Sequence, residues 1–112
     1  MQKNIYSLVA INAKYIHSNL AVRYLKNFCQ KKNFFTHIIE YSINDSMDKI
    51  LKNIYQKRSN VLALSCYIWN IEMILKICRS FKKIRPDSII ILGGPEVSYD
   101  PIEIMSKNPS ID

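Results

Sequence analysis

The residues of this chain that are best suited to chemistry lie in four short segments that follow apolar runs. They contain the only tryptophan, three of the seven tyrosines, one of the two histidines and both glycines, and they span residues 12–19, 42–45, 65–70 and 93–99. Such an aromatic and hydroxyl-rich set suits a large planar or partly apolar ligand better than a bare phosphate. Capping of turns and helices is the alternative, and it explains Ser18, Asn44 and Asn70. It does not explain Tyr67 and Trp69.

Candidates for acid, base or metal chemistry are few. His17 is the better placed of the two histidines for a metal ligand or a general base, because it lies in one of these segments. Hydrogen bonding within its loop is the alternative. His37 falls in a predicted strand and is expected to be structural or to face solvent. Glu96 is a candidate either for catalysis or for binding backbone amides near the glycines, and no Ser/His/Asp or Cys/His arrangement can be assembled.

Two adjacent glycines, Gly93 and Gly94, end the apolar run 89–92 and precede Pro95. The isoleucine-rich run predicts a strand that is buried on both faces, as in a parallel sheet. The carboxyl edge of such a sheet is where open α/β folds bind ligands. Glycine at that edge permits a positive φ and lets the backbone approach a ligand. A tight strand-to-helix turn without a ligand is the alternative.

Missing motifs exclude several kinds of site. The chain has no G-x-G-x-x-G and no G-K-[ST], which disfavours a dinucleotide or nucleoside triphosphate site. A receiver domain needs acidic residues after the first strand, where Asn12 lies instead. Cys29, Cys66 and Cys78 form no C-x-x-C pair, so neither a zinc site nor an iron–sulfur site is predicted.

The elements that must position these segments alternate along the chain. Strands are expected at 5–11, 35–41, 61–66 and 88–92, and helices at 18–31, 47–55, 71–84 and 100–107. Four βα units with short connections predict an α/β fold with a doubly wound parallel sheet, right-handed crossovers and helices on both faces. Residues 110–112 lead toward a fifth strand, so we expect residues 1–112 to be a single domain cut from a longer protein.

Composition agrees with one domain that has a hydrophobic core. The chain has 112 residues, of which 48% are hydrophobic, and no run of 18 apolar residues. Without a signal peptide or a transmembrane segment, a cytoplasmic location without membrane contact is expected. The net charge is +7, but the lysines are scattered, and the doublets at 31–32 and 82–83 end predicted helices, where cations are favoured. Specific binding of nucleic acid is therefore disfavoured.

Three segments together resemble the amino-terminal cobalamin-binding domain of radical SAM enzymes. They are LVAINAKYIHSNLAVRYL at 8–25, LSCYIWN at 64–70 and ILGGPEVS at 91–98. The resemblance covers nearly the whole chain and implies a flavodoxin-like fold that binds cobalamin. The cofactor-binding residues that it implies are His17, Ser18, Asn19, Leu20, Ser65, Cys66, Tyr67, Gly93, Gly94, Pro95 and Glu96. Those at 65–67 and 93–95 would lie beside the nucleotide tail, and those at 18–21 would lie near the lower face of the corrin.

The chain also departs from related patterns. Cobalamin domains of methionine synthases and mutases carry D-x-H-x-x-G, whereas Tyr15 stands two residues before His17 and no glycine follows. Coordination of cobalt by His17 is therefore disfavoured, and no catalytic residue or metal ligand is assigned. The chain lacks C-x-x-x-C-x-x-C. The resemblance therefore implies that the 4Fe-4S cluster, S-adenosylmethionine and the radical SAM barrel belong to the rest of a parent enzyme, with methyl transfer as a candidate reaction.

The leading hypothesis is thus a cobalamin-binding module that holds the corrin at the carboxyl edge of the sheet. Two alternatives remain open. One is a non-catalytic docking domain with a vestigial cobalamin pocket, in which Tyr67, Trp69 and Tyr99 form an interaction patch. The other, less favoured, is an RNA-binding module, which a salt-dependent affinity for RNA would support.

Overall fold

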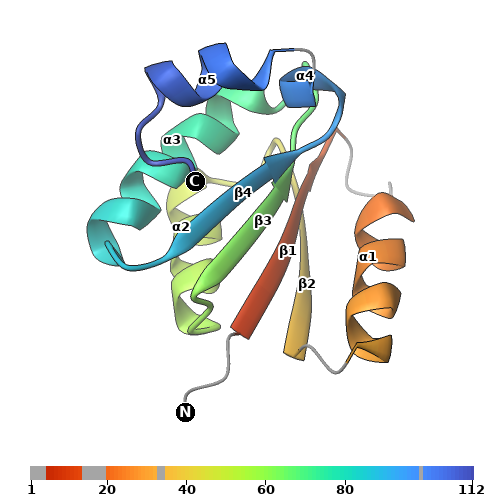
Figure 1. Ribbon diagram of the computed structural model, residues 1–112. Helices are drawn as coiled ribbons and strands as arrows, with labels where there is room; N and C mark the ends of the chain where they lie inside the picture. The colour runs from red at the N-terminus through yellow and green to blue at the C-terminus, as the bar shows by residue number, and fades with distance from the viewer. Residues whose placement is uncertain (1–4, 14–19, 33–34, 99) are drawn as a thin grey trace.

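A computed structural model describes residues 5–13, 20–32, 35–98 and 100–112, in which strands and helices alternate (Figure 1). The strands are β1 (Ile5–Asn12), β2 (Phe35–Ser42), β3 (Val61–Ser65) and β4 (Ile89–Gly93). The helices are α1 (Leu20–Lys31), α2 (Met47–Gln56), α3 (Ile71–Ile84), α4 (Pro95–Ser98) and α5 (Pro101–Lys107). All neighbouring strands are parallel, in the order β2-β1-β3-β4. The predicted α/β fold of the flavodoxin-like type is confirmed.

The order of the strands creates a switch point between β1 and β3. From β1 the chain moves outward to β2, then returns past β1 to β3 and moves outward again to β4. Figure 1 shows α1 on one side of the sheet and α2 and α3 on the other. Connections that leave β1 and β3 on opposite faces leave a crevice between their carboxyl ends, which is where open α/β sheets bind ligands.

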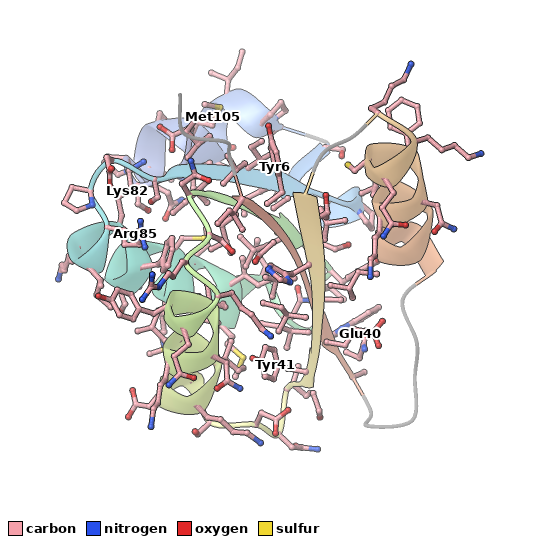
Figure 2. All side chains as sticks on the ribbon, turned by 90° about the horizontal axis from the view of Figure 1, so that it is seen from below. Tyr6, Glu40, Tyr41, Lys82, Arg85 and Met105 are labelled. Carbon is pink, nitrogen blue, oxygen red and sulfur yellow. The ribbon has the colours of Figure 1, made fainter. Side chains whose placement is uncertain are left out.

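The main core lies between the sheet and the helices α2 and α3. Alternate residues of each strand point to opposite faces, and in Figure 2 the neighbours Glu40 and Tyr41 of β2 lie on opposite sides of the strand, with Tyr41 toward α2. Large side chains that are fully buried or nearly so fill this layer; from the sheet and the two helices they are Val9, Ile11, Leu62, Leu64, Ile90, Ile50, Ile54, Ile74, Ile77 and Phe81.

Local signals place the helix ends where the sequence predicts them. The hydroxyl of Ser46 accepts a hydrogen bond from the backbone N–H of Lys49 at 3.2 Å and caps α2. Asp100 caps α5 by accepting from the N–H of Glu103 at 3.1 Å, with Pro101 in the first turn. These caps satisfy N–H groups that have no partner within the helix.

The expectation that β4 is buried on both faces is wrong. Ile90 is fully buried, but Ile89 and Ile91, which point to the other face, are 45% and 49% exposed. The reason is the position of α1, which packs mainly against β2 and β1, at the opposite edge of the sheet from β4 (Figure 1). Among the described residues, the α1 side of the sheet is therefore uncovered at Ile89 and Ile91 of β4, whereas Val61 of β3 on the same side is buried.

The last residues run along the outer edge of β4. The backbone N–H of Asp112 donates to the carbonyl of Ile90 at 2.9 Å, and the N–H of Ile90 donates to the Asp112 carboxylate at 2.9 Å. Lys82 of α3 holds the same carboxylate at 2.6 Å. Within the described part of the chain, none of the helices is both long enough and apolar enough to cross a bilayer.

Candidate functional site

An apolar groove lies on the α1 side of the sheet, between α1 and β4. Its cavity volume is about 350 Å³, at the lower end of the range for small-molecule sites. Strands β1, β3 and β4 form the floor, Leu25 of α1 forms one side, and the loops after β3 and β4 close the upper end. The lining residues are Leu8, Val9, Leu25, Ala63, Leu64, Ser65, Tyr67, Ile91, Gly93, Gly94 and Pro95.

The groove is hollow because small residues meet in its floor. In the register of the sheet, Ala63 of β3 lies between Leu8 of β1 and Ile91 of β4. Two residues further along, Ser65 pairs with Gly93. All of these positions face the α1 side, since residues two apart in a strand share a face. The row of alanine, serine and glycine therefore leaves space between larger neighbours.

Gly94 is required by the protein's own backbone. Its φ is +98°, and a Cβ on it would lie 2.5 Å from the carbonyl oxygen and 2.9 Å from the nitrogen of Cys66. The same loops are joined by hydrogen bonds from the Cys66 N–H to the Gly93 carbonyl at 2.7 Å and from the Glu96 N–H to the Cys66 carbonyl at 3.4 Å. The two loops thus interlock, and only glycine fits at the crossing.

Gly93 differs from its neighbour. A Cβ built on Gly93 would have no atom within 4 Å, and the residue lines the upper end of the groove. The space that its missing side chain leaves is open to a ligand. The sequence treats the two glycines alike, whereas the structure assigns close backbone packing to Gly94 and open groove to Gly93.

The segment after the glycines is not the continuous loop that the sequence predicts. Pro95–Ser98 form the single-turn helix α4, in which the Ser98 hydroxyl donates to the Gly94 carbonyl at 2.7 Å. Val97 is buried, and the side chain of Glu96 is exposed. One turn is too short for a periodic pattern, but proline followed by glutamate was a signal for a helix start.

The side chain of Cys66 points away from the groove. Its thiol is fully buried in the core beneath α2 and α3, where burial, and to a lesser extent the charge of Glu96, raises its pKa to about 12. Burial also raises the pKa of Cys78 to about 12. Cys66 therefore contributes its backbone, but no reactive thiolate, to the sheet edge.

Aromatic rings border the groove at its upper end. Tyr67 lines it, and Trp69 stacks on Tyr67 with ring centroids 4.6 Å apart and planes 2° from parallel. Trp69 is 48% exposed, and Ile68 between them is more exposed still. The stack fixes the position of Tyr67 and leaves one face of the pair accessible.

Asn70, for which capping was the alternative interpretation, has a different role. Helix α3 begins without a hydrogen bond from a capping side chain. The amide of Asn70 is 1% exposed and is bonded on all sides: its oxygen accepts from the N–H of Tyr67 at 2.8 Å, and its nitrogen donates to the carbonyls of Ile11 at 2.9 Å and Ser65 at 3.2 Å. It bridges β1 and β3 at the switch point.

The structure brings together part of the site that the sequence predicts. Five of the named residues line the groove: Ser65, Tyr67, Gly93, Gly94 and Pro95. The side chains of Cys66 and Glu96 point elsewhere, as described above. His17, Ser18 and Asn19 lie outside the described residues, as does Tyr99, and Leu20 begins α1 with its side chain outside them. Among the described residues, His, Cys, Asp and Glu side chains form no group of three that could hold a metal ion.

The sequence analysis did not single out the groove floor. Leu8, Ala63 and Ile91 were assigned to strands without a role, and Leu25 was assigned to a helix stripe. Strand alternation carried a usable signal, because Ala63 is the one small residue of its strand that shares a face with Ser65. What the pattern lacked was the register, which depends on how three strands pair.

Comparison with known families finds a match over nearly the whole chain. The B12-binding domain model matches residues 6–112. Two curated proteins are each 38% identical over 53 residues, which is 47% of this chain. One is a 2-(S-pantetheinyl)-carbapenam-3-carboxylate methyltransferase from Streptantibioticus cattleyicolor, and the other is the cobalamin-dependent radical SAM methyltransferase TokK from Streptomyces tokunonensis. The matched segment is 8% of the length of each relative.

Among solved structures, the chain is similar to the cobalamin-dependent S-adenosylmethionine radical enzyme OxsB, which was determined with aqua-cobalamin and S-adenosylmethionine bound. The match has a TM-score of 0.82 and 18% sequence identity. It covers 98% of this chain and 16% of OxsB. The similarity shows a shared fold, and the matched region is a small part of the length of OxsB.

Proposed function

We propose that this chain, which belongs to the B12-binding domain family, holds cobalamin along the carboxyl edge of its parallel sheet. The observation that carries the proposal is the apolar groove that starts at this edge, with its floor of small residues and its open space at Gly93. A cofactor with a long, partly apolar tail needs such a hollow, because burying apolar surface supplies most of the binding free energy.

The residues divide into those beside the tail and those near the corrin. We place the apolar base of the nucleotide tail over Ala63, between Leu25 and Ile91, with Tyr67 and the Gly93 backbone at its entrance. Cys66 and Glu96 would take part through the backbone bonds that hold the two loops together. The segment from His17 to Leu20, at the start of α1, is proposed to lie near the lower face of the corrin.

The role of the chain is to bind and orient the cofactor. Bound cobalamin supplies a cobalt centre that carries a methyl group or takes part in a radical step. The described residues around the groove are apolar or neutral, so they provide shape and exclude water but no general acid or base.

We further propose that the parent protein is a radical SAM enzyme. The curated relatives are much longer than this chain, and TokK is by name a cobalamin-dependent radical SAM methyltransferase. In that arrangement a 4Fe-4S cluster and S-adenosylmethionine belong to a barrel elsewhere in the parent chain. The carboxyl edge, with the exposed Trp69 and Ile68, is the surface that would meet the barrel.

A fifth strand beside β4 is part of the same proposal. The motivation is that the backbone N–H of Asp112 donates to the Ile90 carbonyl at the edge of β4, while the Ile90 N–H donates to the Asp112 side chain. The exposed Ile89 and Ile91 lie on the same strand and offer an apolar surface to whatever follows it. Such an addition would extend the wall of the groove on the side away from α1.

A titration with hydroxocobalamin tests the binding mode. We would record visible spectra of the chain, of Gly93→Leu and of Ile89→Phe as the matched control. Leucine at 93 projects into the open space of the groove, so we expect it to lower the affinity at least tenfold while the urea midpoint stays near that of the wild type. Ile89 does not line the groove, and its variant should bind like the wild type.

Two outcomes would contradict the proposal. Equal binding by Gly93→Leu and the wild type would mean that the groove does not hold the cofactor. No saturable spectral change with the wild-type chain would favour the second candidate, a docking domain with a vestigial pocket. The half-exposed stack of Tyr67 and Trp69 is the observation that supports that alternative.

A further inference from the structure

The strongest unassigned feature of the described residues is the buried amide of Asn70 at the switch point. Between β1 and β3 the ladder ends at the pair Ala10 and Ser65. Beyond that pair β3 no longer continues as a strand, and the carbonyl of Ile11 accepts a hydrogen bond from the side-chain amide of Asn70 at 2.9 Å. Buried carbonyls of this kind need donors, since each one left unpaired costs free energy.

The amide of Asn70 bonds two carbonyls and one N–H donor at once. Its NH₂ group donates to Ile11 and Ser65, and its oxygen accepts from the N–H of Tyr67. Only one orientation of the amide fits, because two of its three neighbours accept and one donates. A shorter hydroxyl cannot span the three partners, and a carboxylate has no N–H to offer the two carbonyls.

The consequences reach the groove through one continuous chain of bonds. Asn70 fixes the backbone of Ser65 and Tyr67, which flank Cys66. The Cys66 backbone in turn holds Gly93 at 2.7 Å and Glu96 at 3.4 Å. A shift at Asn70 therefore moves Tyr67 and the Gly93 turn, which form the upper end of the groove.

We propose that Asn70 is a positioning residue: without touching the cofactor, it sets the conformation of the loop 65–67 and thereby the affinity of the groove. This inference rests on the proposed cobalamin site. It predicts the effect of a substitution that keeps the shape of the Asn70 side chain but replaces its NH₂ donor by an acceptor. Such a substitution should change the conformation of the loop 65–67 and weaken cofactor binding, while the main core stays intact.

The test is Asn70→Asp, with Asn44→Asp as the matched control. Asn44 is exposed in the turn after β2, at the same sheet edge, so its variant makes the same charge change without the buried bonds. In Asn70→Asp the second oxygen faces two carbonyls, and it can be accommodated only when it carries a proton. Burial and these carbonyls raise the pKa of the introduced carboxyl, so the native loop should persist at low pH and be lost as the pH rises through that raised value.

Two readouts separate the inference from the proposed function. The emission of Trp69, the only tryptophan, reports the loop in protein without cofactor, because its ring stacks on Tyr67. The dissociation constant for hydroxocobalamin reports the groove. The neighbouring segments carry Cys66, Tyr67, Glu72 and Glu96, so every value is compared with that of the wild type at the same pH, and far-UV circular dichroism verifies the fold.

We expect Asn70→Asp to match the wild type within about threefold in affinity at pH 5 and to bind at least tenfold more weakly at pH 8. Trp69 emission should change over the same interval, and Asn44→Asp should follow the wild type throughout. Wild-type emission and affinity in Asn70→Asp at pH 8 would overturn the inference, as would a shift in emission with unchanged affinity. If the wild type fails to bind hydroxocobalamin while the Trp69 emission of Asn70→Asp still changes with pH, the proposed function is wrong. The conclusion that Asn70 sets the conformation of the loop 65–67 would then remain.

Discussion

Replacing Gly94 by alanine should destabilise the fold, whereas the same change at Gly93 should not. At Gly94 the new Cβ would lie 2.5 Å from the Cys66 carbonyl oxygen, at a φ of +98°. At Gly93 it would meet nothing within 4 Å. The two substitutions add the same atoms to adjacent residues, so their difference isolates the effect of backbone geometry.

The magnitude follows from two contributions. Holding a non-glycine residue at a positive φ costs about 1–2 kcal/mol, and forcing a contact this short between rigid backbone atoms adds about 1–3 kcal/mol. We therefore expect Gly94→Ala to lower the free energy of unfolding by roughly 2–5 kcal/mol. Gly93→Ala should change the free energy of unfolding by less than about 1 kcal/mol. The change should be stabilising, because alanine lowers the conformational entropy of the unfolded chain.

Urea denaturation followed by circular dichroism measures both values. With a slope of about 2 kcal/mol per molar urea, the Gly94→Ala midpoint should fall by roughly 1–2.5 M while the slope stays the same. If the free energies of unfolding of the two variants differ by less than about 1 kcal/mol, the interlock between Gly94 and Cys66 is not a determinant of the fold, and our distinction between the two glycines is wrong.

Two further predictions concern thiols and the chain end. Cys66 and Cys78 are fully buried, and burial raises the pKa of each thiol to about 12. A thiol reagent at pH 8 should therefore label one cysteine of the native chain, the half-buried Cys29, and all three cysteines after unfolding. Rapid labelling of two or three cysteines in the native chain would contradict this prediction. Hydrogen bonds from Lys82 and the Ile90 backbone lower the pKa of Asp112 below its ordinary value of 3.8, so the wild type should exceed Asp112→Asn in stability above that pH by about 0.5–1 kcal/mol, as for an exposed ion pair. This advantage should vanish as the pH falls through the lowered value, and a difference that does not depend on pH would exclude the carboxylate as its source.

Features set by local sequence could be predicted well. The cap at Asp100, the proline after it and the glutamate that follows specify the start of α5 without reference to the rest of the chain. The ends of α3 and the existence of all four strands follow equally from spacing and from breakers such as Pro86. The parallel arrangement of the strands then follows from the alternation of strands and helices along the chain and from their short connections.

Features set by distant partners could not be predicted. The exposure of Ile89 and Ile91 depends on how far α1 extends across the sheet, which no property of the run itself determines. The different roles of Gly93 and Gly94 depend on Cys66, which lies on another strand connection. Asn70 is a residue type that commonly caps helices, and its bridging role becomes visible only when the fold brings it next to Ile11, 59 residues earlier.

The two faces of the same strands differ in packing, and the proposed function assigns stability to one and binding to the other. On the α2 and α3 side, Leu62, Leu64 and Ile90 are fully buried or nearly so, and they join the main core. On the α1 side, the residues next to these in sequence, Ala63 and Ile91, form part of the groove floor, which the described helices leave uncovered. Because a strand alternates its faces, a site can be hollowed on one side without removing a core residue from the other. The switch point itself is occupied by a protein side chain, that of Asn70, so in the proposed binding mode the ligand would lie on the α1 face and not in the crevice.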